Sequence, residues 1–106
     1  MLTDEYRYKI LKELQQDPDI SQRELARRLN ISLGKTNFCL KALIEKGLVK
    51  ADNFKNSTNK TKYLYLLTPK GLEEKVSLTQ NFLKRKLKEH EELEKEIEQL
   101  RKEVKS

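Results

Sequence analysis

Five residues between positions 34 and 41 have the chemistry to read base edges from the outer face of a helix. They are Gly34, Lys35, Asn37, Phe38 and Lys41. An asparagine amide pairs bidentately with adenine, a lysine bonds guanine or phosphate, and an aromatic ring contacts a thymine methyl. Glycine lets a backbone approach closely. Because no carboxylate joins this outward set until Glu45, the pattern predicts a surface for nucleic acid.

The segment that carries these residues reads as two short helices joined by a tight turn. Ser21 is a good N-cap, and Glu24 three positions on completes the pattern of a capping box. Asn30 tolerates a turn conformation, Ser32 can cap the second helix, and Gly47 can end it. The spacing therefore predicts two capped helices separated by a turn of a few residues.

The second helix, at about 32–46, has one apolar face. Its members recur at i, i+3, i+4, i+7 and i+8, and they are Thr36, Cys39, Leu40, Leu43 and Ile44. Two helices sharing a small core across a tight turn form a helix-turn-helix, whose second helix enters the major groove. Phosphate contacts are then expected from Ser21, Gln22, Arg23 and Ser32. The alternative is an ordinary helical hairpin.

Length and charge agree with a small nucleic-acid-binding protein. The chain has 106 residues, 38% of them charged, and a net charge of +6. From 20 to 62, ten Lys and Arg stand against three acidic residues, whereas 89–98 holds six glutamates and one lysine. Clustered basic charge on the predicted helix-turn-helix is an electrostatic footprint for nucleic acid.

Other classes of function are disfavoured. The chain shows no apolar run of about 18 residues and no secretory h-region, so we expect no membrane span and a cytoplasmic location. Cys39, the sole cysteine, excludes an intrachain disulfide and reads as a buried residue rather than a redox switch. His90 has no second ligand nearby, so no metal is expected. We expect no enzyme and no cofactor, since there is no nucleophile–base pair or glycine-rich phosphate loop.

The rest of the first 68 residues predicts a third helix and a β-hairpin. Thr3 can cap a helix running to about Gln16. Strands at 48–54 and 63–67 flank a polar loop at 55–62, which suits contact with phosphates or a minor groove. The expected contacts are Lys55, Asn56, Asn59, Lys60 and Lys62. The alternative is a solvated loop.

A long helix is predicted to close the chain. Thr68 and Pro69 form a helix start, and no proline or later glycine interrupts the stretch from there to Val104. About 37 residues would span ~55 Å at 1.5 Å per residue. Its apolar positions predict a homodimer by coiled-coil pairing. They are Leu72, Val76, Leu83, Leu87, Leu93, Ile97, Leu100 and Val104.

The pairing of this helix has alternatives. β-branched residues at a and leucine at d in its last turns favour two parallel strands, but the orientation stays open. The helix could instead lie on its own domain with a frayed tail. A basic run at 84–88 could touch DNA backbone or form a solvated face. The expected division is a DNA-binding domain at 1–68 and a dimerisation helix at 69–106, in a mainly α fold with a small β-hairpin (α+β).

Three segments resemble winged helix-turn-helix transcriptional regulators of the MarR family. They are the Ile-Ser-Gln-Arg-Glu-Leu-Ala run at 20–26, the segment at 40–49, and Leu-Leu-Thr-Pro-Lys-Gly at 66–71. The chain as a whole resembles the short bacterial subgroup of EPS-associated regulators. That resemblance implies double-stranded DNA as the partner and control of extracellular-polysaccharide genes.

One departure from the MarR pattern changes what the resemblance implies. MarR proteins usually carry a further N-terminal helix that interlocks with the C-terminal helices, and this chain begins too late to contain it. Dimerisation then falls to the terminal helix, as in PadR-like regulators, and a MarR-type effector pocket stays open. The rival reading is a winged-helix module that binds proteins without DNA. The operator, the effector and the sign of regulation are also open.

Overall fold

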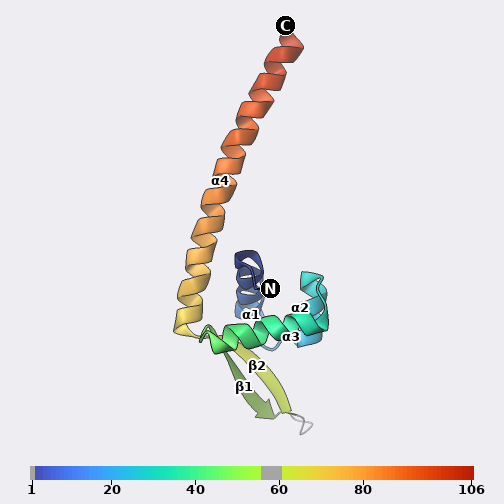
Figure 1. Cartoon of the computed structure of the whole chain (residues 1–106), viewed down its shortest axis with the longest axis vertical. Coiled ribbons are helices and arrows are strands. Elements are labelled where there is room, and N and C mark those ends of the chain that lie inside the picture. The colour runs from blue at the N-terminus through green and yellow to red at the C-terminus, as the bar shows by residue number, and fades with distance from the viewer. Residues whose placement is uncertain (1, 56–60) are drawn as a thin grey trace. The chain divides into compact units, whose positions relative to one another are not determined.

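The computed structural model describes residues 2–55 and 61–106, and the side chains of 53–55 and 61–63 lie outside that description. In chain order the described elements, shown in Figure 1, are α1 (Asp4–Gln16), α2 (Gln22–Leu29), α3 (Leu33–Glu45), β1 (Val49–Lys55), β2 (Thr61–Leu67) and α4 (Pro69–Lys105). The mainly α architecture with one antiparallel hairpin, predicted from the sequence, is confirmed. By compactness the chain divides into Met1–Val76 and Ser77–Ser106, and each unit is described by itself.

Helix α1 begins and ends as predicted. The Thr3 hydroxyl accepts a hydrogen bond from the Tyr6 N–H at 3.2 Å, and acidic residues occupy the first turn, where they complement the helix dipole. Arg7 lies 2.6 Å from Asp4 and 3.2 Å from Glu74, which ties α1 to the first turns of α4. The buried apolar side chains of the first unit are Ile10, Leu11, Leu14, Ile20, Leu25, Ala26, Cys39, Leu40, Leu43, Leu48, Val49 and Tyr65.

The turn between α2 and α3 is set by capping groups at both sides. Ser21 Oγ accepts from the Glu24 N–H, and Ser32 Oγ accepts from the Lys35 N–H, each at 3.0 Å. Asn30 takes the left-handed conformation at φ 55° and ψ 48°, which asparagine tolerates better than most residues. Both N-caps and the left-handed turn residue are as the sequence predicted.

Helix α3 ends in a Schellman motif. Gly47 has φ +75°, its N–H donates to Ile44 O at 3.0 Å, and the Leu48 N–H donates to Leu43 O at 3.0 Å. These bonds occupy two of the carbonyls that a helix leaves without partners. The stop predicted at Gly47 is therefore confirmed together with its physical reason.

The hairpin strands are longer on the turn side than the predicted 48–54 and 63–67. Pairing runs from Val49 opposite Leu67 to Lys55 opposite Thr61, so the connection narrows from 55–62 to 56–60. Ladder hydrogen bonds come from the backbone, so a solvated hairpin can extend through polar residues. At its base, the Tyr65 N–H donates to Pro18 O at 3.0 Å, which attaches β2 to the α1–α2 connection.

Helix α4 starts at a crowded junction. The Thr68 N–H donates to Leu48 O at 3.0 Å, and the Thr68 hydroxyl donates to Gly47 O at 2.5 Å while accepting from the Gly71 N–H at 3.0 Å. Pro69 occupies the first helical position, where its missing N–H costs nothing. A Cβ at Gly71 would lie 2.0 Å from Leu48 O. Glycine is therefore required there by close backbone approach.

We expect Gly71→Ala to lower the free energy of unfolding by roughly 1–3 kcal/mol, the usual cost of overpacking a filled site. The added methyl would collide with Leu48 O and displace either the α4 start or the α3–β1 connection. Gly34→Ala is the matched control, since a Cβ at Gly34 meets nothing within 4 Å. That change should raise stability by about 0.5–1 kcal/mol through helix propensity. Urea unfolding measures both, and equal effects would contradict the steric account.

Candidate nucleic-acid interface

Helix α3 buries one face and presents the other. Thr36, Cys39, Leu40 and Leu43 are buried, and the Thr36 hydroxyl donates to Ser32 O at 3.0 Å. Ile44, predicted to share that face, is 37% exposed. Its position lies about 100° around the helix from Leu43, beyond the edge of the buried stripe. The prediction for Ile44 was wrong, and the other four were right.

The outward face carries most of the residues proposed to read bases. Gly34, Phe38 and Lys41 are exposed, with 58% of Phe38 accessible, and Asn37 is half-buried beside them. A Cβ at Gly34 would find open space. The structure thus brings an amide, an ammonium and an aromatic ring together around a position without a side chain. Their contacts with bases stay predictions.

Lys35 takes a different direction from the other outward residues. It is half-buried, and its Nζ lies 4.2 Å from the centroid of the Tyr6 ring in α1. An ammonium over an aromatic face gains about 0.5–1 kcal/mol at an exposed site. Lys35 therefore links the first turn of α3 to α1. If Lys35 contacts guanine or phosphate, its ammonium would reach them from the side of α3 that faces Tyr6.

The N-terminus of α3 keeps the character expected of an anion site. Ser32 is exposed and caps the helix, and the first turn contains no acidic residue. The first N–H groups of a helix carry a partial positive charge and point toward any bound anion. This end of α3 can therefore hold a phosphate, as predicted for Ser32.

The first turn of α2 is joined to the base of the hairpin. Gln22 Nε2 donates to the Tyr65 hydroxyl at 2.9 Å, across 43 residues of sequence. Tyr65 is buried, so the amide of Gln22 is held in one orientation. Ser21 and Arg23, the other predicted phosphate contacts of α2, are exposed. Nothing in the local pattern could have revealed the bond between Gln22 and Tyr65.

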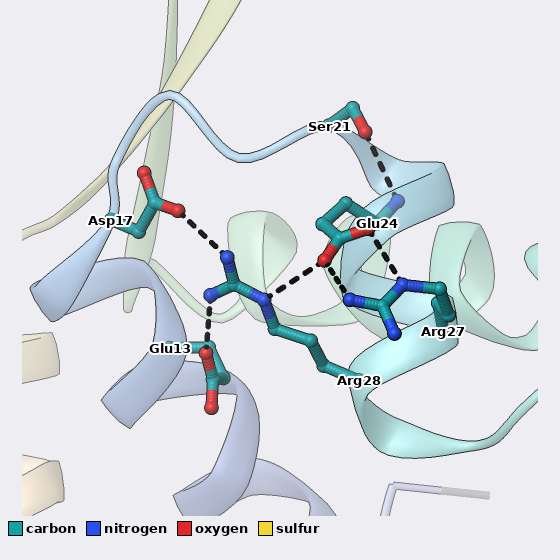
Figure 2. A network of polar contacts seen from close by, with 6 residues as sticks. All are labelled: Glu13, Asp17, Ser21, Glu24, Arg27 and Arg28. Atoms are coloured by element: carbon teal, nitrogen blue, oxygen red, sulfur yellow. Dashed lines mark hydrogen bonds and ion pairs between the residues drawn. The ribbon is translucent and has the colours of Figure 1, made fainter.

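Two of the arginines of α2 are committed to carboxylates of the protein, as Figure 2 shows. Arg28 reaches Glu13 of α1 at 2.9 Å, Asp17 at 3.2 Å and Glu24 at 3.3 Å. Arg27 binds both carboxylate oxygens of Glu24, with Nε 2.8 Å from Oε2. The cluster ties α1 to α2. It also pairs two of the ten basic residues between 20 and 62 with carboxylates, so their charges are not free for DNA.

The same cluster shifts the ionisation of its members. The hydrogen bonds from Arg27, and then those from Arg28, lower the pKa of Glu24 from 4.5 to about 2. A lowered carboxylate pKa contributes stability above the ordinary value, and this contribution is lost as the pH falls from 4.5 toward 2. The Glu24 carboxylate binds Arg27 and Arg28, and the described half of the predicted capping box is the bond from the Glu24 N–H to Ser21 Oγ.

The predicted contacts of the hairpin loop are described only in part. Lys55 is the last residue of β1, and Lys62, opposite Phe54, is the second residue of β2. Asn56, Asn59 and Lys60 lie outside the described residues. A role in binding DNA stays a prediction for all five.

Helix α4 carries the predicted dimerisation residues as exposed apolar groups. They range from 41% to 86% exposed: Leu72 and Val76 in the first unit, and Leu83, Leu87, Leu93, Ile97, Leu100 and Val104 in the second. Lys86 and His90, two polar residues between them, each lie beside a carboxylate of the same helix. Lys86 lies 3.3 Å from Glu89, and His90 lies 3.0 Å from Glu94.

Two other features are absent from the described residues. These residues include no group of three or more His, Cys, Asp or Glu placed to hold a metal ion. Within the same residues, no helix has a stretch long and apolar enough for a bilayer.

Residues 3–50, which cover α1, α2 and α3, match the model of the winged helix-turn-helix DNA-binding family. The hairpin that follows α3 is then the wing. Residues 3–50 are thus a winged helix-turn-helix of the DNA-binding kind, and the fold is similar to that of MarR and PadR-like regulators. The matched family is defined by DNA binding, which agrees with a regulator rather than an enzyme. No curated protein matches the sequence significantly.

Solved structures share this fold. A PadR-like transcriptional regulator from Bacillus cereus aligns with a TM-score of 0.72 at 22% identity, over 82% of this chain and 89% of its own. The adhesin competence repressor of Streptococcus pyogenes aligns with a TM-score of 0.65 at 21% identity, over 84% of this chain and 64% of its own. Staphylococcus aureus MarR, solved with salicylate and kanamycin, aligns with a TM-score of 0.60 at 25% identity, over 76% of this chain and 53% of its own. The winged helix and α4 thus span only part of the last two proteins.

Arg23 is the arginine of α2 that makes no ion pair with the side chains the structure describes. We expect Arg23→Gln to weaken DNA binding and to reduce the slope of log affinity against log salt concentration by about 0.9, the value for one lost phosphate contact. Arg27→Gln is the matched control, because Glu24 already neutralises Arg27. Fluorescence anisotropy at several salt concentrations measures both. Equal changes in slope would show that the pairing does not withhold Arg27.

Proposed function

We propose that this protein is a dimeric bacterial transcriptional regulator that binds double-stranded DNA sequence-specifically. In this proposal α3 enters the major groove and the loop at 55–62 lies on the backbone or in the minor groove. The observation that carries the proposal is the outward face of α3. It presents an amide, a lysine and an aromatic ring around Gly34, with no carboxylate before Glu45.

Contacts with phosphates would fix the register of α3 in the groove. The exposed guanidinium of Arg23 and the N-terminus of α3 supply positive charge beside it. Gln22 has two amide donors, and one of them is bound to Tyr65, so the other can serve a phosphate oxygen. Because Tyr65 belongs to β2, this bond would also keep the wing in register with α2.

The second part of the proposal is a homodimer through α4. Exposed Leu93, Ile97, Leu100 and Val104 recur with the 3–4 spacing of a coiled-coil seam. Each such side chain gains roughly 1.5–3 kcal/mol when it leaves water, so a helix with this stripe is stabilised by a partner. A second copy supplies an identical stripe. Two copies would also present two α3 helices to a two-fold symmetric operator.

The resemblance of the whole chain to EPS-associated regulators extends the proposal to the control of extracellular-polysaccharide genes. The name of the similar S. aureus protein records salicylate and kanamycin as bound to that protein. Neither molecule is proposed as an effector here.

Selection from random-sequence duplexes at two salt concentrations tests DNA recognition. We expect enrichment of a two-fold symmetric site whose half-sites lie about one or two helical turns apart. Salt-sensitive binding without any enriched sequence would reduce the protein to an architectural DNA binder. Failure to bind at low salt would overturn the proposal.

Dimerisation is tested by a matched pair of substitutions in the last turns of α4. Leu100→Glu places a charge in the seam, and we expect monomers by sedimentation velocity at micromolar concentration. Gln99→Glu adds the same charge one residue earlier, at an outer heptad position, and should leave a dimer. A monomeric parent protein, or equal behaviour of the two variants, would contradict pairing through this seam.

A second candidate function is protein binding by the same face. It is favoured by two exposed apolar side chains on α3, Leu33 at 43% and Phe38 at 58%. A winged-helix module that binds proteins would present such groups to a partner. The surrounding polar and basic residues favour DNA.

A further inference from the structure

Two exposed apolar side chains lie in the first two turns of α3, and one of them, Leu33, has no role in the interface described so far. Leu33 is 43% exposed and Phe38 is 58% exposed. Neither belongs to the buried core, so both are available to a molecule that docks on this face of α3. Sequence reasoning had assigned no role to Leu33, although its first-turn position off the buried stripe was a usable signal.

Gly34, between these two side chains in the sequence, is not required by the fold itself. Among the described glycines, Gly47 has a positive φ and Gly34 does not, so the backbone conformation does not require glycine at position 34. A Cβ would meet nothing within 4 Å, so no packing in the described residues requires glycine. Glycine weakens a helix relative to alanine. The open space above Gly34 is therefore available to a molecule outside the chain.

The three residues form one small feature of the surface. At about 100° per residue, Leu33 and Phe38 lie on opposite sides of Gly34 around the helix axis, and Phe38 lies one turn further along. Leu33 and Phe38 are thus about 140° apart around the helix, and the position without a side chain lies between them. We call Leu33, Gly34 and Phe38 the apolar notch.

We propose that the apolar notch receives the 5-methyl groups of thymines in the major groove. This inference rests on the proposed function and deepens it, because it names the base that the recognition helix selects. Thymine is the one DNA base whose major-groove edge carries a methyl group. A methyl group is apolar and small enough to enter where a Cβ is absent.

The neighbouring side chains favour thymine over an apolar protein partner. Asn37 lies one turn beyond Leu33 on the same flank of α3, and an A·T pair shows the adenine N6 and N7 beside the thymine methyl. One base pair can therefore satisfy the amide and the apolar notch together. Lys41 and the positive N-terminal end of α3, whose first turn has no acidic residue, add charge that complements DNA. The site is expected to be rich in A·T pairs where α3 docks.

Replacing thymine by deoxyuridine tests this directly, because it removes the methyl and leaves every hydrogen-bonding group of the base. The probes are duplexes carrying the site obtained by selection, with one thymine replaced at a time. We expect affinity to fall about three- to fivefold at one or two positions of each half-site, the effect of uncovering one methyl. Fluorescence anisotropy at fixed salt measures it.

Protein variants show which residue meets the methyl. Leu33→Ala and Phe38→Ala should each remove the thymine-over-uracil preference at one position, and Gly34→Ala should weaken binding to thymine duplexes while leaving the protein at least as stable. Ile44→Ala is the matched control: Ile44 is an exposed apolar residue at the far end of α3, and its loss should keep the preference.

Three outcomes overturn the inference in distinguishable ways. Sequence-specific binding that is equal for thymine and uracil at every position removes the methyl contact and leaves the proposed function standing. A loss of affinity in Leu33→Ala that is equal on both duplexes makes Leu33 a supporting residue only. Failure of the parent protein to bind any duplex overturns the proposed function itself and favours an apolar protein surface as the occupant.

Discussion

The peptide of Leu48 is the constraint on which the remaining arrangement depends. Its N–H closes the C-terminus of α3 on Leu43, and its carbonyl accepts from Thr68 at the entrance to α4. The same carbonyl leaves no room for a side chain at Gly71. The end of α3, the base of the wing and the beginning of α4 are therefore fixed by one residue. The orientation of α3 and the start of the proposed dimerisation helix are not independent.

Local chemistry made much of this fold predictable. Thr3, Ser21, Ser32 and Thr68 begin helices because each hydroxyl satisfies an N–H within three residues, and such pairs can be read from the sequence. Gly47 ends α3 for a similarly local reason. The strand ends were less predictable, because backbone pairing can continue through polar residues that carry no apolar signal.

The interior of the candidate site could not be predicted in the same way. The partner of Lys35 is an aromatic ring in α1, and the partner of Gln22 is a hydroxyl in β2. Both contacts join residues that are distant in sequence, and a single sequence carries no trace of them. Arg28 shows the same limit, since its carboxylates at positions 13 and 17 are supplied by α1 and the connection after it. The sequence tells which residue types are available for DNA. It does not tell which of them are already bound to other side chains of the protein.

The paired arginines of α2 have a kinetic consequence. An arginine bound to a carboxylate presents a dipole, whose field weakens with distance faster than that of a single charge. Arg27 and Arg28 therefore add little to the long-range attraction of a polyanion, although they dominate the charge of α2 in a simple count. Arg23 and the two lysines of α3, Lys35 and Lys41, would then supply most of the steering from this part of the surface. An approaching duplex would be oriented toward Arg23 and α3 before any base is read.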